Sequence, residues 1–196
     1  MRQNNHLIAI AGGIGSGKSE VMSILKEAGA SIIMTDEINR RLLQDESYIK
    51  KLQEVFPYAF NSGFLNKTVL KERIFSDNNE RKKLNATAHS AIIREVELAS
   101  ALLPPPVFVE IPLIIESGTA HSFEQIWAVR SPLEERVRRI VLRDGLTEEF
   151  AKSIIRAQKG EDKIFAIANV IIDNSGDKSS LKEKILQIYS RYLQVQ

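Results

Sequence analysis

A glycine-rich segment near the start of the chain constrains the fold more than any other feature of the sequence. Gly12, Gly17, Lys18 and Ser19 satisfy the pattern G-x-x-x-x-G-K-S/T. The apolar run 7–11 before it predicts a buried strand, and apolar residues at helical spacing follow it. A plain glycine turn is the alternative, but a chance match is expected in roughly one chain in a hundred of this length. Strand, glycine loop and helix in this order are typical of a site for nucleotide phosphates.

The positions of this loop have predictable chemical roles. Its glycines let the backbone wrap an anion, so that successive N–H groups converge on phosphate oxygens, helped by the positive end of the helix. We expect these groups to come from Gly13, Ile14, Gly15, Ser16 and Gly17. Lys18 is expected to contact the β and γ phosphates, and the Ser19 hydroxyl is a hard oxygen ligand suited to Mg²⁺.

The remaining apolar runs predict an α/β fold. Further strands are expected at 31–34, 107–111, 126–129 and 170–172, with helical patterns between them. In the helix expected at 133–143, Leu133, Val137, Ile140 and Val141 should form the apolar stripe, with Arg136, Arg139 and Arg143 on the other face. This alternation predicts a three-layer fold around a parallel sheet of about five strands, closed by a C-terminal helix.

The segment 45–104 has a different character and predicts a helical insertion. Helices are expected at about 47–56, 67–75 and 78–102, with no strand, and a run of prolines ends the last helix. With 196 residues the chain should form a single domain. We expect it to consist of a core (1–44 and 105–196), a helical acceptor lobe (45–104) and a lid (144–166).

Composition excludes several function classes. A net charge of +2 is too small to indicate binding to nucleic acid or a membrane surface. The chain has no cysteine, which excludes disulfide scaffolds and thiolate zinc sites and fits a reducing compartment. No apolar segment is long enough to cross a membrane. The sequence therefore predicts a cytoplasmic protein, either a monomer or a weak homo-oligomer.

A nucleoside triphosphate site leaves a kinase, a switch or motor hydrolase, and a non-catalytic sensor as alternatives. A guanine switch is disfavoured because no Asn-Lys-x-Asp occurs and the 107–111 strand runs into Glu110-Ile111-Pro112. A kinase needs an acceptor pocket, a group that orients the acceptor hydroxyl, and cations near the moving phosphoryl group. The helical insertion could hold the acceptor, Asp36 could orient its hydroxyl, and cations of the lid region could lie near the phosphoryl group. These cations are Arg139, Arg143, Arg156, Lys159 and Lys163.

The chain resembles the dephospho-CoA kinase family nearly end to end. Residues 11–19 are similar to the family's T-G-G-I-G-S-G-K-S, and residues 111–116 to its V-P-L-L-F-E. Shorter matches are Thr35-Asp36, Leu84-Asn85 with His89, Arg143-Asp144, Gln158 and Ile171–Gly176. The chain departs from the family pattern at Met34, Ser90, Asn169 and Glu20, the last of which replaces a usual Thr.

This resemblance implies ATP- and Mg²⁺-dependent phosphorylation of the ribose 3′-hydroxyl of dephospho-CoA, which gives coenzyme A and ADP. Asp36 would be the general base, or only a helix N-cap, and His89 would lie near the acceptor, or be structural. Arg143 would contact the adenine or the phosphates, the alternative being a solvated helix face. Asn174 and Gly176 would form the loop beside the adenine, or an ordinary turn.

Two acidic residues near the expected site each have two possible roles. Glu110 closes an apolar strand and would hold a Mg²⁺-bound water or be a structural carboxylate. Glu20 follows Ser19 and would tune the metal or face solvent at the helix start. Another small-molecule kinase acting on a nucleoside or nucleotide remains the alternative function, followed by an ATP sensor without catalysis.

Overall fold

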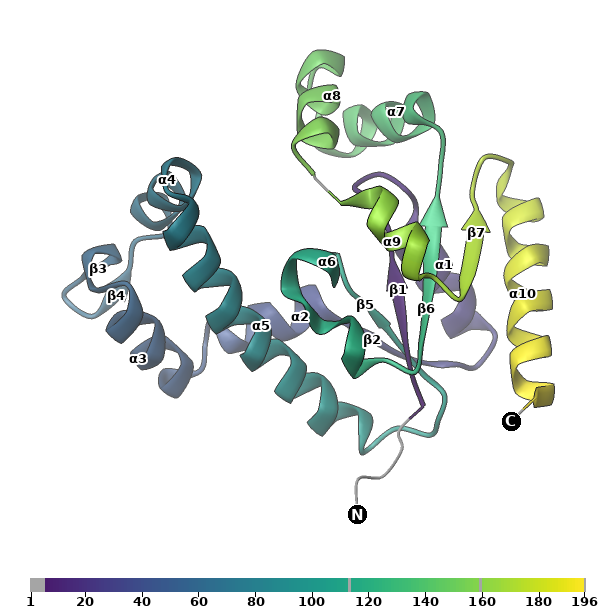
Figure 1. Ribbon diagram of the computed structural model, residues 1–196, viewed down its shortest axis with the longest axis horizontal. Coiled ribbons are helices and arrows are strands. Elements are labelled where there is room, and N and C mark those ends of the chain that lie inside the picture. The colour runs from purple at the N-terminus through teal and green to yellow at the C-terminus, as the bar shows by residue number, and fades with distance from the viewer. Residues whose placement is uncertain (1–5, 113, 159, 196) are drawn as a thin grey trace. The chain divides into compact units, whose positions relative to one another are not determined.

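The computed structural model of the chain describes residues 6–112, 114–158 and 160–195 (Figure 1). Leu113, in the segment similar to the family's V-P-L-L-F-E, and the lid cation Lys159 lie outside the described residues. Chain contacts divide the protein into two compact units, one of residues 1–33 and 100–196 and the other of residues 34–99. No helix in the described part of the chain is long and apolar enough to span a bilayer.

A five-stranded parallel sheet forms the centre of the fold, as predicted. Its order is β2-β5-β1-β6-β7. The strands are β1 (Leu7–Ala11), β2 (Ser31–Met34), β5 (Val107–Glu110), β6 (Gln125–Arg130) and β7 (Val170–Asp173). Every residue of β1 and β5 is buried, which explains why these strands are continuous apolar runs rather than alternating ones. Parallel pairing brings Ile10 opposite Glu110 and Arg130 opposite Asp173.

Helices cover both faces of this sheet. Figure 1 shows α1 (Lys18–Glu27) behind the sheet, where it contacts α10 (Lys178–Val195), and α9 (Glu161–Ile167) in front of it. α9 contacts β6 and the short helix α6 (Ile114–Ser117), which precedes the 3-10 turn η2 (Thr119–Ser122). The three-layer arrangement expected from the sequence is therefore present.

The helices α7 (Leu133–Asp144) and α8 (Glu148–Ala157) pack against each other after β6. Val137 and Ile140 are buried as expected, but the sequence-based assignment of the faces of α7 is wrong at each side. Leu133 is 47% exposed, whereas Arg136 is only 5% exposed. The reason is that Arg136 has polar partners on neighbouring segments, which apolar periodicity does not report.

The unit of residues 34–99 is mostly helical. Its elements are α2 (Thr35–Leu42), α3 (Glu46–Val55), η1 (Pro57–Ala59), β3 (Phe60–Asn61), β4 (Phe64–Leu65), α4 (Lys67–Ser76) and the greater part of α5 (Asn78–Ser100). The helices agree with the predicted ranges, but the expectation of no strand is wrong. β3 and β4 form a hairpin whose turn residues Ser62 and Gly63 have φ of 49° and 84°. Strands of two residues are too short to produce a sequence period.

Candidate active site

The carboxyl ends of four parallel strands bring the candidate site together. β1 leads into the glycine loop at Gly12, β5 ends at Glu110, β6 leads to Ser131, and β7 leads to Asn174. Because neighbouring parallel strands end at the same edge of a sheet, these positions meet there. The sheet thus places the predicted phosphate loop beside polar residues from distant parts of the chain.

The glycine loop 12–17 is wound tightly in front of α1. Gly15 and Gly17 have φ of 75° and 100°, and a side chain at Gly17 would collide with the Asn174 amide. The Lys18 ammonium is buried and donates to the carbonyl oxygens of Gly12 at 2.9 Å and Gly13 at 3.0 Å. The charge of Lys18 therefore lies within the curve of the loop.

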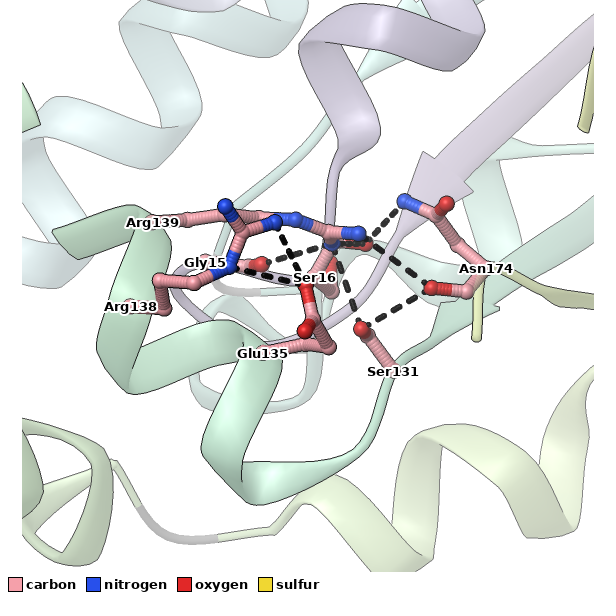
Figure 2. A network of polar contacts seen from close by, with 7 residues as sticks. All are labelled: Gly15, Ser16, Ser131, Glu135, Arg138, Arg139 and Asn174. Atoms are coloured by element: carbon pink, nitrogen blue, oxygen red, sulfur yellow. Dashed lines mark hydrogen bonds and ion pairs between the residues drawn. The ribbon is translucent and has the colours of Figure 1, made fainter. Parts of the chain in front are cut away.

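A polar network holds the loop from its outer side (Figure 2). Arg139 donates through Nη1 to the carbonyl oxygens of Gly15 at 3.2 Å and Ser16 at 3.1 Å. Asn174 donates through Nδ2 to the same Ser16 carbonyl at 2.9 Å. Ser131 and Arg139 both donate to the Asn174 carbonyl, at 3.0 Å and 3.3 Å. The network thus links α7, the end of β6 and the end of β7 to two carbonyl groups of the loop.

The direction of these carbonyl groups fixes the direction of the loop's N–H groups. In a planar trans peptide, the C=O of one residue and the N–H of the next point in opposite directions. Because the carbonyl of Ser16 is held outward by Arg139 and Asn174, the N–H of Gly17 is turned to the opposite side. Successive N–H groups turned to one side form an anion-binding concavity at the start of a helix.

The residue types at the predicted metal position fit a divalent cation. Ser19 is exposed, and its hydroxyl lies 3.4 Å from Oε1 of Glu110, which is 8% exposed. A hydroxyl and a carboxylate are the hard oxygen donors that Mg²⁺ prefers, with phosphate oxygens and water as its other ligands. The described residues contain no group of three or more His, Cys, Asp or Glu that would bind a metal by themselves.

Two other side chains predicted for the nucleotide site, those of Arg143 and Glu20, pair with residues outside the loop. Arg143 is exposed and pairs with the neighbouring Asp144 at 2.8 Å, which raises the pKa of the guanidinium and lowers the pKa of the carboxyl. Gly176 is exposed in the turn after β7. Glu20 pairs with Lys178 of α10 at 3.5 Å, so its carboxylate is directed to that helix.

The predicted acceptor residues Asp36 and His89 belong to the unit of residues 34–99. Met34 is the N-cap of α2, and Asp36 lies exposed in the first turn of this helix, so the N-cap interpretation of Asp36 is wrong. The helix begins two residues earlier than the capping pattern suggested. His89 is half-buried in α5, and burial lowers the pKa of its imidazole.

The sequence did not identify the residues that support the loop from α7. Arg139 was expected as a lid cation and Arg136 on a solvent-facing side of α7, yet both donate to loop carbonyl groups. Gln158, noted only as a family match, accepts a hydrogen bond from the N–H of Ile14 at 2.7 Å, so this N–H, which was predicted for the phosphates, is bonded here to a side chain. The available signal was the spacing of Arg136 and Arg139, which places them on one side of a helix.

The sheet order, the strand–loop–helix unit and the buried lysine define a protein of the P-loop kinase fold. The crystal structure of TT1252 from Thermus thermophilus is similar, with a TM-score of 0.80 and 32% identity over 94% of this chain and 96% of that chain. Dephospho-CoA kinase of Sodalis glossinidius is 33% identical over 96% of this chain and 92% of its own length. Dephospho-CoA kinase of Thermus thermophilus is 34% identical over 91% of this chain and 88% of its own length. A model of the family described as dephospho-CoA kinase matches residues 6–180, and the chain belongs to that family.

Proposed function

We propose that the protein transfers the γ-phosphoryl group of ATP to the ribose 3′-hydroxyl of dephospho-CoA, with Mg²⁺ bound to the nucleotide. The observation that carries this proposal is the loop 12–19, whose carbonyl groups at Gly15 and Ser16 are held outward beside the buried Lys18. Family membership supplies the acceptor, since the loop itself recognises only phosphates. The family also makes a simple nucleoside acceptor the less favoured alternative.

The transfer forms one bond and breaks another. The 3′-oxygen of the acceptor attacks the γ-phosphorus while the bond from that phosphorus to the β–γ bridging oxygen breaks, leaving ADP. The hydroxyl proton passes to a carboxylate, the role we assign to Asp36, which would first orient the hydroxyl. Because the transition state is largely dissociative, most of the acceleration should come from position and charge, supplied by the loop N–H groups and Lys18.

The remaining roles belong to the same proposal. Mg²⁺, when bound with ATP, neutralises phosphate charge, and Ser19 would hold it directly with Glu110 acting through a bound water. Arg143 would contact the adenine or the phosphates, Asn174 and Gly176 would flank the adenine, and residues 144–166 would form the lid. His89 would lie near the acceptor. A cytoplasmic location, a monomeric or weakly associating state and no binding to nucleic acid or membrane remain predictions from the sequence.

A panel of acceptors tests this function. With Mg²⁺-ATP, release of ADP should be fast with dephospho-CoA and slow with simple nucleosides and nucleotides. The variant Lys18→Met should reduce turnover roughly a hundredfold or more, since it removes a preorganised charge from the transition state. Lys26→Met is the matched control, because Lys26 is exposed at the end of the same helix and should keep full activity.

The alternative functions give different results in the same experiment. Equal turnover of nucleosides and dephospho-CoA would contradict the proposed acceptor and favour a nucleoside kinase. Binding of ATP without turnover of any acceptor would favour the non-catalytic sensor. Full activity of Lys18→Met would contradict the role of the loop itself.

A further inference from the structure

Ile14, in the middle of the phosphate loop, is held at three points by the segment that follows β6. Its N–H donates to Oε1 of Gln158 at 2.7 Å, and its carbonyl accepts from Nε of Arg136 at 2.9 Å. Its side chain packs against the apolar cluster formed between α7 and α8, whose buried members are Val137, Ile140, Ala151 and Ile155. Ile14 is therefore attached to these helices through its N–H, its carbonyl and its side chain, in addition to the contacts of Arg139 with Gly15 and Ser16.

Arg136 is the centre of this attachment. Its side chain is 6% exposed, and besides the Ile14 carbonyl it binds both carboxylate oxygens of Glu161 through Nη1, at 2.6 and 2.9 Å. The pair lies directly over Gly13, where any side chain would collide with the guanidinium. A buried guanidinium is costly unless its charge is compensated, and Glu161 at the start of α9 compensates it.

The third nitrogen of the Arg136 guanidinium, Nη2, lacks a hydrogen bond to any described residue in this position. Nη2 is buried and has no hydrogen-bond partner among the described residues. Such a group is destabilising, so the position of Arg136 is explained by the contacts that it makes rather than by an optimal site for an arginine. Those contacts are the loop carbonyl and the carboxylate of Glu161.

We infer that Arg136 is a positioning residue for ATP, and that Glu161 keeps it in place. By holding the carbonyl of Ile14 outward, Arg136 turns the N–H of Gly15 toward the side of the loop where the phosphates bind. Arg139 holds the carbonyls of Gly15 and Ser16 in the same way, and Asn174 also holds that of Ser16, so Arg136 and Arg139 set consecutive peptides of the loop. This inference rests on the proposed function in one respect only, namely that the loop binds ATP.

Two measurements on the same samples test the inference. Titration calorimetry with Mg²⁺-ATP, without any acceptor, gives the ATP affinity, and thermal unfolding gives the stability. Arg136→Gln should weaken ATP binding roughly tenfold to a hundredfold, because it removes a charged hydrogen bond that orders the loop. Arg138→Gln is the matched control on the same helix: Arg138 is exposed and pairs with Glu135, so ATP binding should be unchanged.

The exchanged variant, R136E combined with E161R, separates positioning from a simple ion pair. The exchange again places opposite charges at positions 136 and 161, so the melting temperature of this variant should be closer to that of the wild type than the melting temperature of Arg136→Gln. ATP binding should stay weak, because a carboxylate at position 136 cannot donate to the Ile14 carbonyl. Recovery of both properties would overturn the inference, and so would wild-type ATP affinity in Arg136→Gln.

If Arg136→Gln does not fold, Arg136→Lys is measured in its place. A lysine keeps the charge next to Glu161 but lacks the planar fork that serves both acceptors, so ATP binding should still weaken several-fold. Wild-type affinity in this variant would overturn the inference. Failure of the wild type to bind ATP would instead contradict the proposed function, so the two failures are distinguishable.

Discussion

Gly17 shows at the scale of one residue how the loop depends on its neighbours. Its φ of 100° is strained for any other residue, and a Cβ would collide with the Asn174 side chain, which itself holds the Ser16 carbonyl. Gly17→Ala should therefore lower ATP affinity by a factor of about ten or more, since it strains the backbone and displaces Asn174. Calorimetric titration with ATP measures this loss.

Gly29→Ala is the control for backbone strain alone. Gly29 has a φ of 87°, but no atom lies within 4 Å of a Cβ placed there. The substitution should cost roughly 1 kcal/mol of stability and leave ATP affinity unchanged. Equal losses of affinity in the two variants would contradict the view that contact with Asn174 makes Gly17 essential.

The half-buried imidazole of His89 predicts a pH dependence of stability. Burial lowers its pKa in the folded state below the usual value of 6.5, so the folded protein binds fewer protons there than the unfolded chain. The contribution of His89 to the free energy of unfolding is fully present above about pH 6.5, and it decreases as the pH falls toward the lower pKa of the folded state. His89→Asn should reduce the fall in melting temperature between about pH 7.5 and about pH 5.5.

Thermal unfolding across this pH range is the measurement, with His121→Asn as control. His121 is exposed in η2, and its removal should leave the pH profile close to that of the wild type. A profile of His89→Asn that coincides with the wild type would show that burial of His89 does not contribute to acid sensitivity.

Residue by residue, the sequence located the loop but not its supports. The glycines, Lys18 and Ser19 are recognisable because they follow the fixed spacing of a phosphate-loop motif. Arg136 and Arg139 are more than a hundred residues from the loop in the sequence. Their contacts with the loop exist only after α7 packs beside it in the folded protein. The roles assigned to Asp36, His89 and Arg143 remain predictions.

At the scale of elements, strands and helices with several apolar residues were predictable. β1 and β2 have the expected bounds, β5 and β7 differ from theirs by one residue at one end, and β6 differs by one residue at each end. Long apolar runs locate such elements because burial of the whole strand requires them. The β3–β4 hairpin depends instead on two turn residues with positive φ, a signal that composition alone did not reveal.

The contact between α7 and α8 gives a prediction at this scale. Ile155 is 8% exposed in the cluster that also receives Ile14 of the loop. Ile155→Ala should reduce the free energy of unfolding by about 2 to 4 kcal/mol and weaken ATP binding, because the loop loses part of its packing. Chemical denaturation and ATP titration measure the two effects.

Leu142→Ala supplies the comparison for this prediction. Leu142 also lies on α7 but is 73% exposed, so its truncation should change stability by at most about 0.5 kcal/mol. If both variants lose stability equally, the α7–α8 cluster is not what holds these helices together.

For the whole molecule, the two compact units correspond to different parts of the proposed reaction. Residues 1–33 and 100–196 contain the loop, Glu110, Arg136, Arg139 and Asn174, which we assign to ATP. Residues 34–99 contain Asp36 and His89, which we assign to the acceptor. The overall fold class was predictable because strand and helix patterns alternate along the chain, whereas the choice of acceptor depends on family membership.

The most direct test of this account follows the phosphoryl group itself. ATP carrying a labelled γ-phosphate is incubated with the protein, Mg²⁺ and dephospho-CoA, and the product is treated with a phosphatase specific for ribose 3′-phosphates. We expect the label to appear in coenzyme A and to be released by that phosphatase. Label recovered only as inorganic phosphate, or at another position of the acceptor, would contradict the account.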